Sequence, residues 1–326
     1  MPIIKSDFKP AWWLSNPHLQ TVWSAVFKAR PELMLSNHRV ELPDGDFIDL
    51  AKTDFQNKPI VLILHGMEGS LESHYAKPLI KHLDEAGFGV CFMHFRGCSG
   101  ELNRLPRGYS SADSDDLQSV VDAIQHDYGR APHAIIGFSL GGSVLLKWLG
   151  ENGNNAMTQT AIAVSVPFQL RDAAERLGQD FSRVYQKYLI NTCQQKFKQK
   201  TSLLDYPVEV NVDELNTFFS FDDKITAPLH GFKDAEDYYQ RCSSRQFLNK
   251  IHKPTLIIHS RDDPFMWEHT APEEHELSAM VHLELSESGG HVGFISGKYP
   301  WKVEYWLDNR ILQWLKSKPV NATHVN

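Results

Sequence analysis

The sequence has few of the features that mark membrane, nucleic-acid-binding and exported proteins. Its longest strictly apolar run, Ile60–Leu64, has about five residues, whereas a membrane-spanning helix needs about 20. No Lys/Arg-rich run occurs, and the formal net charge is -7, so nucleic acid is not an expected partner. The first ten residues contain no apolar signal core. We therefore expect a cytoplasmic protein without a transmembrane segment.

Signatures of metal and cofactor binding are also missing. The four cysteines form no C-x-x-C pair, and reduced thiols are the default in the cytosol. His269, His275 and His282 have neither H-E-x-x-H nor another common zinc spacing. No G-x-G-x-x-G or Walker A motif is present. We therefore expect no metal and no cofactor.

What the sequence does contain is an alternation of apolar runs and helical patterns. A Pro43–Asp46 turn joins two short strands into a hairpin. Strands are then predicted over 59–64, 88–95, 133–138, 160–166, 254–259 and 281–285, and helices over 71–86, 113–128, 140–149 and 303–315. Such alternation is typical of an α/β fold, in which helices cover both faces of a mostly parallel sheet.

The alternation stops between Pro167 and Lys250. This stretch is polar and helix-like, with interleaved aromatic residues such as Phe218 and Phe219. We predict that 167–250 is an inserted helical cap, whose aromatic residues partly line an apolar pocket. Residues 1–166 and 251–326 would form the core, with segment 1–38 packed on it. The lysines of 196–200 are expected on a solvated helix face.

The segment Gly137–Gly141 has the pattern G-x-S-x-G between a predicted strand and a predicted helix. In this context the pattern is typical of a nucleophile elbow, where a strained turn exposes Ser139 at the carboxyl edge of the sheet. Glycine is needed on both sides because side chains there would collide with neighbouring backbone.

A serine nucleophile needs a base and an orienting acid, and both follow Ser139 in the chain. His291 lies between glycines just after the last predicted strand, so we expect it to be the base. Asp262 and Asp263 both follow the preceding strand. We favour Asp263 as the acid, but the sequence leaves Asp262 open.

Two backbone N–H groups would complete such a site by binding the oxyanion. One comes from Leu140, directly after the nucleophile. The other is expected at Met67, because Gly66 lets the loop after the strand 59–64 turn toward the serine.

Six segments together resemble the α/β-hydrolase superfamily, and within it the YheT-like hydrolases, relatives of the ABHD1/ABHD2/ABHD3-type lipid hydrolases. They are Asn16–Thr21, His65–Gly69, Arg96–Gly100, Gly137–Gly142, Asp262–Phe265 and Gly290–Gly293. The resemblance implies the α/β-hydrolase fold, a triad of Ser139, Asp263 and His291, and oxyanion amides at Met67 and Leu140. It also implies carboxylic-ester hydrolysis and, in some relatives, acyl transfer to an alcohol.

The expected partner is therefore a small ester with an apolar acyl chain. Two alternatives stay open, namely a serine peptidase or amidase on the same triad, and a non-catalytic binding protein of the same fold. The aromatic stretch Trp12–Phe27 is expected to pack over the domain, the alternative being a helix at a membrane surface.

Overall fold

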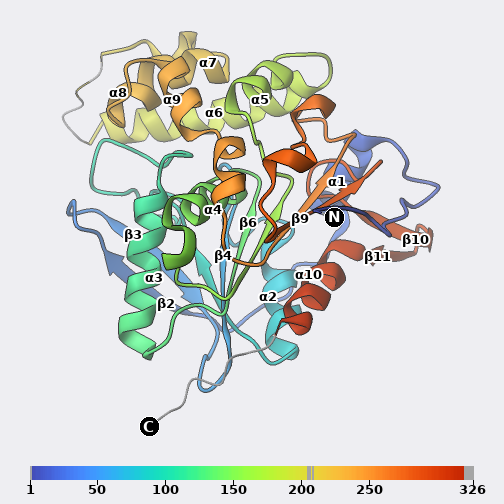
Figure 1. The fold of residues 1–326 in the computed structure, drawn as a ribbon. Coiled ribbons are helices and arrows are strands. Elements are labelled where there is room, and N and C mark those ends of the chain that lie inside the picture. The colour runs from blue at the N-terminus through green and yellow to red at the C-terminus, as the bar shows by residue number, and fades with distance from the viewer. Residues whose placement is uncertain (1, 204–206, 208, 319–326) are drawn as a thin grey trace.

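A central sheet organises the computed structural model, which describes residues 2–203, 207 and 209–318 (Figure 1). The strands of the central sheet are β1 (Ile3–Lys5), β2 (Ser36–Glu41), β3 (Phe47–Lys52), β4 (Ile60–Leu64), β5 (Gly89–Met93), β6 (Ala134–Phe138), β7 (Thr160–Val164), β8 (Thr255–Ser260) and β9 (Val281–Ser286). Strands β10 (Ile295–Tyr299) and β11 (Lys302–Tyr305) form a separate two-stranded sheet. The α-helices are α1 (Pro17–Phe27), α2 (Ala76–Glu85), α3 (Ser114–Tyr128), α4 (Leu140–Asn152), α5 (Leu170–Leu177), α6 (Ser182–Thr201), α7 (Phe218–Phe221), α8 (Ala227–Leu229), α9 (Ala235–Cys242) and α10 (Trp306–Ser317).

Nine strands form one sheet in the order β1-β9-β8-β7-β6-β4-β5-β3-β2. All neighbours from β1 to β5 in this order pair in parallel, whereas β3 pairs antiparallel with both β5 and β2. All residues of β4, β6 and β7 are buried, as continuous apolar runs in a doubly covered parallel sheet should be. The predicted α/β class with a mostly parallel sheet is thus confirmed.

The sheet separates two hydrophobic cores. The apolar faces of α3 and α4 pack on one side, through residues such as Leu117 and Leu145. The faces of α2 and α10 pack on the other side, through residues such as Leu79 and Ile311. Figure 1 shows these two layers, with α5 to α9 together at the top, beyond the sheet. These helices lie in the chain between β7 and β8.

Two predicted helices begin later than their sequence patterns suggested. The helix predicted over 71–86 begins at Ala76, because the Ser70 and Ser73 hydroxyls accept backbone N–H groups in preceding turns, an alternative to helical pairing. The helix predicted over 303–315 begins at Trp306. The residues before it form β11, which pairs with β10, so a tertiary contact overrides the helical spacing.

The N-terminal segment is built into the core domain. Strand β1, which the sequence analysis missed, pairs in parallel with β9. Asn16 caps α1 by accepting the N–H groups of His18 and Leu19. Gln20 on this helix is fully buried and donates to the carbonyls of Leu14 and Ile295. Within the described ranges, no helix is both long enough and apolar enough to cross a bilayer.

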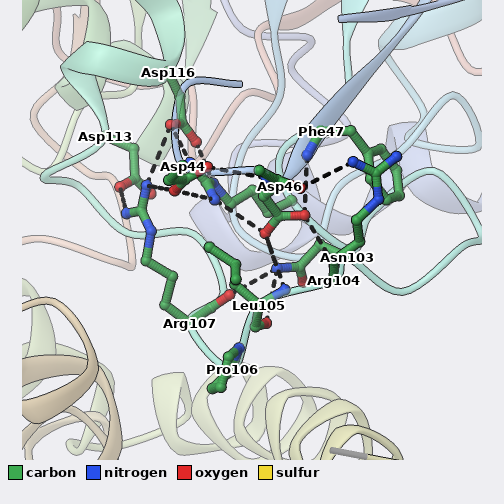
Figure 2. A network of polar contacts seen from close by, with 12 residues as sticks. Asp44, Asp46, Phe47, Asn103, Arg104, Leu105, Pro106, Arg107, Asp113 and Asp116 are labelled. Carbon is green, nitrogen blue, oxygen red and sulfur yellow. Dashed lines mark hydrogen bonds and ion pairs between the residues drawn. The ribbon is translucent and has the colours of Figure 1, made fainter. Parts of the chain in front are cut away.

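The lysines of α6 do not share one solvated face, so that prediction is wrong. Lys200 is 5% exposed and donates to the Asn103 side chain and to the carbonyls of Pro106 and Arg107. Burial lowers the pKa of Lys200 to about 8. The loop that receives it is fixed to the core at Asp46, which accepts from the Asn103 amide at 2.6 Å (Figure 2). Helix α6 therefore packs on a loop that Asp46 already anchors to the sheet.

Candidate active site

Ser139 occupies a strained turn between β6 and α4. Its φ of 51° and ψ of -119° are unusual for a residue with a side chain. The flanking glycines are sterically required. A Cβ on Gly137 would lie 2.4 Å from the Gly141 carbonyl oxygen, and one on Gly141 would lie 2.4 Å from the His65 carbonyl oxygen. The backbone thus has the form of a nucleophile elbow, at the carboxyl end of a central strand.

The structure brings Ser139, His291 and Asp263 into one hydrogen-bonded chain. The Ser139 Oγ lies 3.0 Å from His291 Nε2. On the other ring nitrogen, His291 Nδ1 lies 2.8 Å from Asp263 Oδ2 and 3.2 Å from Oδ1. Asp263 is 3% exposed and His291 is 8% exposed. Because an ionised carboxylate only accepts, Nδ1 carries the proton and Nε2 is free to accept from the serine hydroxyl.

The neighbouring carboxylate, Asp262, has a different contact. Its Oδ1 accepts the backbone N–H of Gly290 at 3.0 Å, so it holds the loop that carries His291 rather than the imidazole itself. Burial raises the pKa of Asp262. Of the two acids that the sequence left open, only Asp263 hydrogen-bonds to the histidine ring in the described part of the chain.

Two side chains that fix His291 were missed by the sequence analysis. The Phe265 ring stacks on the imidazole with centroids 3.9 Å apart and planes within 1°. Thr21, from α1, accepts the backbone N–H of His291 through its Oγ1 at 2.9 Å. Both residues lie in segments that carried the family resemblance, Asp262–Phe265 and Asn16–Thr21. The resemblance included these segments, but it could not indicate their contacts with His291, because those contacts depend on the fold.

Met67 and Leu140 both adjoin the same serine, Leu140 as the next residue in the chain and Met67 in the loop after β4. A Cβ built on Gly66 would approach the Ser139 Cβ to 3.2 Å, so this loop lies directly against the elbow. Among the described residues, neither N–H has a hydrogen-bond acceptor. Both residues line the pocket that contains Ser139 and His291. Two residues next to Ser139 in this pocket thus have backbone N–H groups that are free to donate.

His65 fixes the peptide plane that carries the Met67 N–H. Its Nε2 accepts the Phe95 N–H at 3.1 Å, so Nδ1 carries the proton and donates to the Gly66 carbonyl at 2.6 Å. Because a trans peptide is planar, holding the Gly66 oxygen also sets the opposite direction for the Met67 N–H. Burial lowers the pKa of His65 to about 3, so the ring stays neutral at physiological pH.

Two adjoining pockets open beside Ser139. The wall of the pocket that contains the serine is mainly apolar and comes largely from α5, α6 and α7, with Leu170, Ala173, Ala174, Leu177, Leu189, Phe218 and Met266. The second pocket extends along α6 and shares Met67, Leu140 and Phe218 with the first. Phe219 is 41% exposed and lines neither pocket, so only one of the two highlighted phenylalanines forms a wall.

Comparison with known proteins shows the family of the chain. A family model described as "alpha/beta hydrolase fold" matches residues 59–298. The chain is 41% identical to "Putative esterase YheT" of Escherichia coli over 319 residues, which cover 95% of this chain and 93% of that protein. It is 27% identical to "Phospholipase ABHD3" of Mus musculus, with 93% and 77% covered.

A solved structure, the Pyrococcus furiosus esterase Pf2001, superposes with a TM-score of 0.58 at 18% identity, covering 97% of this chain and 98% of that one. At this identity the superposition supports the fold alone. The sequence matches also show the family. The chain belongs to the α/β-hydrolase family and, within it, to the YheT-like group.

Proposed function

We propose that this protein is a serine hydrolase that cleaves carboxylic esters through an acyl-enzyme. The observation that carries the proposal is the continuous chain from Ser139 Oγ through His291 to Asp263, with distances of 3.0 and 2.8 Å. A hydroxyl, a base and an orienting carboxylate in this order are what nucleophilic catalysis by serine requires.

In the proposed reaction, Ser139 attacks the ester carbonyl while His291 Nε2 takes the hydroxyl proton. The negative charge that develops on the carbonyl oxygen is bound by the N–H groups of Met67 and Leu140. The imidazolium, stabilised by Asp263, then donates its proton to the leaving alkoxide. His291 next removes a proton from water, which attacks the acyl-enzyme, and then returns this proton to Ser139 Oγ as the acid is released. An alcohol in place of water would give acyl transfer.

The proposed substrate is a small ester with an apolar acyl chain. The wall of the pocket at Ser139 is largely aliphatic and aromatic, and burial of each methylene there would contribute about 0.8 kcal/mol. Relatives named as an esterase and a phospholipase support an ester of this kind. A cytoplasmic setting remains part of the proposal and can be checked by cell fractionation.

A fluorophosphonate probe tests the nucleophile directly. The wild type should be labelled and should hydrolyse p-nitrophenyl esters, and Ser139→Ala should do neither. Ser119→Ala, whose hydroxyl makes an exposed hydrogen bond within α3, is the control and should keep its labelling. Equal labelling of wild type and Ser139→Ala would refute the assignment. Labelling without turnover of any ester would instead favour a different acyl substrate.

A further inference from the structure

The residue after Met67 is held in an uncommon backbone conformation by a buried tyrosine. Glu68 has a φ of 53°, in the left-handed region that side chains disfavour. Its N–H donates to the Tyr109 hydroxyl at 2.6 Å, and that hydroxyl donates to Glu68 Oε1 at 2.8 Å. Tyr109 is itself fixed by stacking on Phe95, with centroids 5.2 Å apart. One tyrosine thus binds both the main chain and the side chain of Glu68.

The other carboxylate oxygen of Glu68 faces the cap. Lys196 Nζ, on α6, lies 2.8 Å from Glu68 Oε2. The side chain of Glu68 is 5% exposed and that of Lys196 is 30% exposed, so this ion pair is shielded from water on the glutamate side. A carboxylate in such a site requires a counter-ion. The cap therefore supplies the charge that balances a buried group next to Met67.

We propose that Lys196 is a positioning residue, which holds the Met67 N–H in place through Glu68 only when the cap is seated. This rests on the proposed ester hydrolysis. His65 fixes the Gly66 carbonyl on one side of Met67, and Tyr109 with Lys196 fixes Glu68 on the other. Without Lys196, the unpaired carboxylate of Glu68 turns toward water and carries the adjoining backbone with it. The oxyanion site then depends on the position of α6.

The test compares Lys196→Met with Lys198→Met, a matched control two residues along α6. The Lys198 side chain is 51% exposed and pairs with Asp213 on the surface. Loss of one oxyanion donor typically lowers kcat by about 100- to 1000-fold, so a displaced donor should lower it by roughly 10- to 100-fold. We expect this fall in kcat per fluorophosphonate-titrated site for Lys196→Met, with KM within about threefold. Lys198→Met should match the wild type.

An alkyl trifluoromethyl ketone supplies an independent readout, because its adduct with the serine places an oxyanion between the two amides. Its inhibition constant should rise by the same factor as kcat falls in Lys196→Met, and Lys196→Arg should restore both values. If Lys196→Met does not fold, Glu68→Gln replaces it. The amide keeps an acceptor for Tyr109 but lacks the charge that Lys196 binds, and we expect the same fall in kcat without a change in KM.

The outcomes separate the two proposals. A wild type that neither reacts with the probe nor cleaves esters overturns the proposed function and, with it, this inference. An active wild type with unchanged kcat in Lys196→Met overturns the inference alone. A rise in KM with unchanged kcat and unchanged ketone inhibition also overturns it, because Lys196 would then contact substrate rather than position the loop.

Discussion

Asp222 is a carboxyl group that folding buries in the cap, and its replacement by asparagine should stabilise the protein at neutral pH. The residue is 9% exposed and forms part of the wall of both pockets beside Ser139. Its oxygens accept the Thr226 hydroxyl at 2.6 Å and the Tyr239 hydroxyl at 2.8 Å. Burial nevertheless raises its pKa from 3.8 to about 6, because two neutral hydroxyls only partly replace the water that solvates an anion.

The sign of the effect follows from this shift. Between pH 3.8 and about 6 the unfolded chain has lost the Asp222 proton while the folded chain still holds it, so stability falls as the pH rises. Above that window both states are ionised and the deficit is constant. The rise in the pKa from 3.8 to about 6 lowers the free energy of unfolding above this window by about 3 kcal/mol. Asp222→Asn cannot ionise, so it should be more stable than the wild type by up to about 3 kcal/mol at pH 8.

Urea unfolding followed by tryptophan fluorescence at several pH values between 4 and 8 measures this difference. The advantage of Asp222→Asn should grow with pH and level off near pH 7, and it should be small at pH 4. Asp213→Asn, whose side chain is 65% exposed in the cap, should show no comparable gain. An Asp222→Asn protein that is no more stable than the wild type at pH 8, or equally favoured at every pH, would refute the reasoning.

Two further predictions concern catalysis. Asp263→Asn should lower kcat by about 10³- to 10⁴-fold, since the imidazole loses the partner that fixes its tautomer, whereas Asp262→Asn should retain most of its turnover. Steady-state kinetics on one ester would show the reverse order if the acid were misassigned. Phe218→Ala should extend the acyl length at which kcat/KM peaks, each accommodated methylene adding roughly fourfold. Phe219→Ala should leave the chain-length profile unchanged, and a profile that moved in neither variant would place the acyl chain elsewhere.

Local sequence patterns determined the central part of the fold. Short continuous apolar runs such as Ile60–Leu64, alternating with helical patterns, are typical of strands in a sheet covered on both faces, and the structure has that sheet. The G-x-S-x-G pattern predicted that both glycines are sterically required. The close contact at Gly137 is local, with the Gly141 carbonyl, whereas the one at Gly141 is with the His65 carbonyl after the neighbouring strand. The strands and the elbow were therefore predictable, because they depend mainly on neighbouring residues and on the burial of apolar side chains.

Contacts between distant segments were decided only by the tertiary structure. Asp262 and Asp263 are adjacent in sequence, and only the direction of each side chain relative to the loop of His291 separates their contacts. Thr21 meets His291 across 270 positions of the chain. Lys196 and Lys200 read as surface lysines on a polar helix, yet α6 lies against loops that present a buried carboxylate and inward-facing carbonyls. A charged side chain can be buried only where acceptors surround it. For these two lysines the acceptors come from distant parts of the chain, which the hydrophobic periodicity of one helix cannot predict.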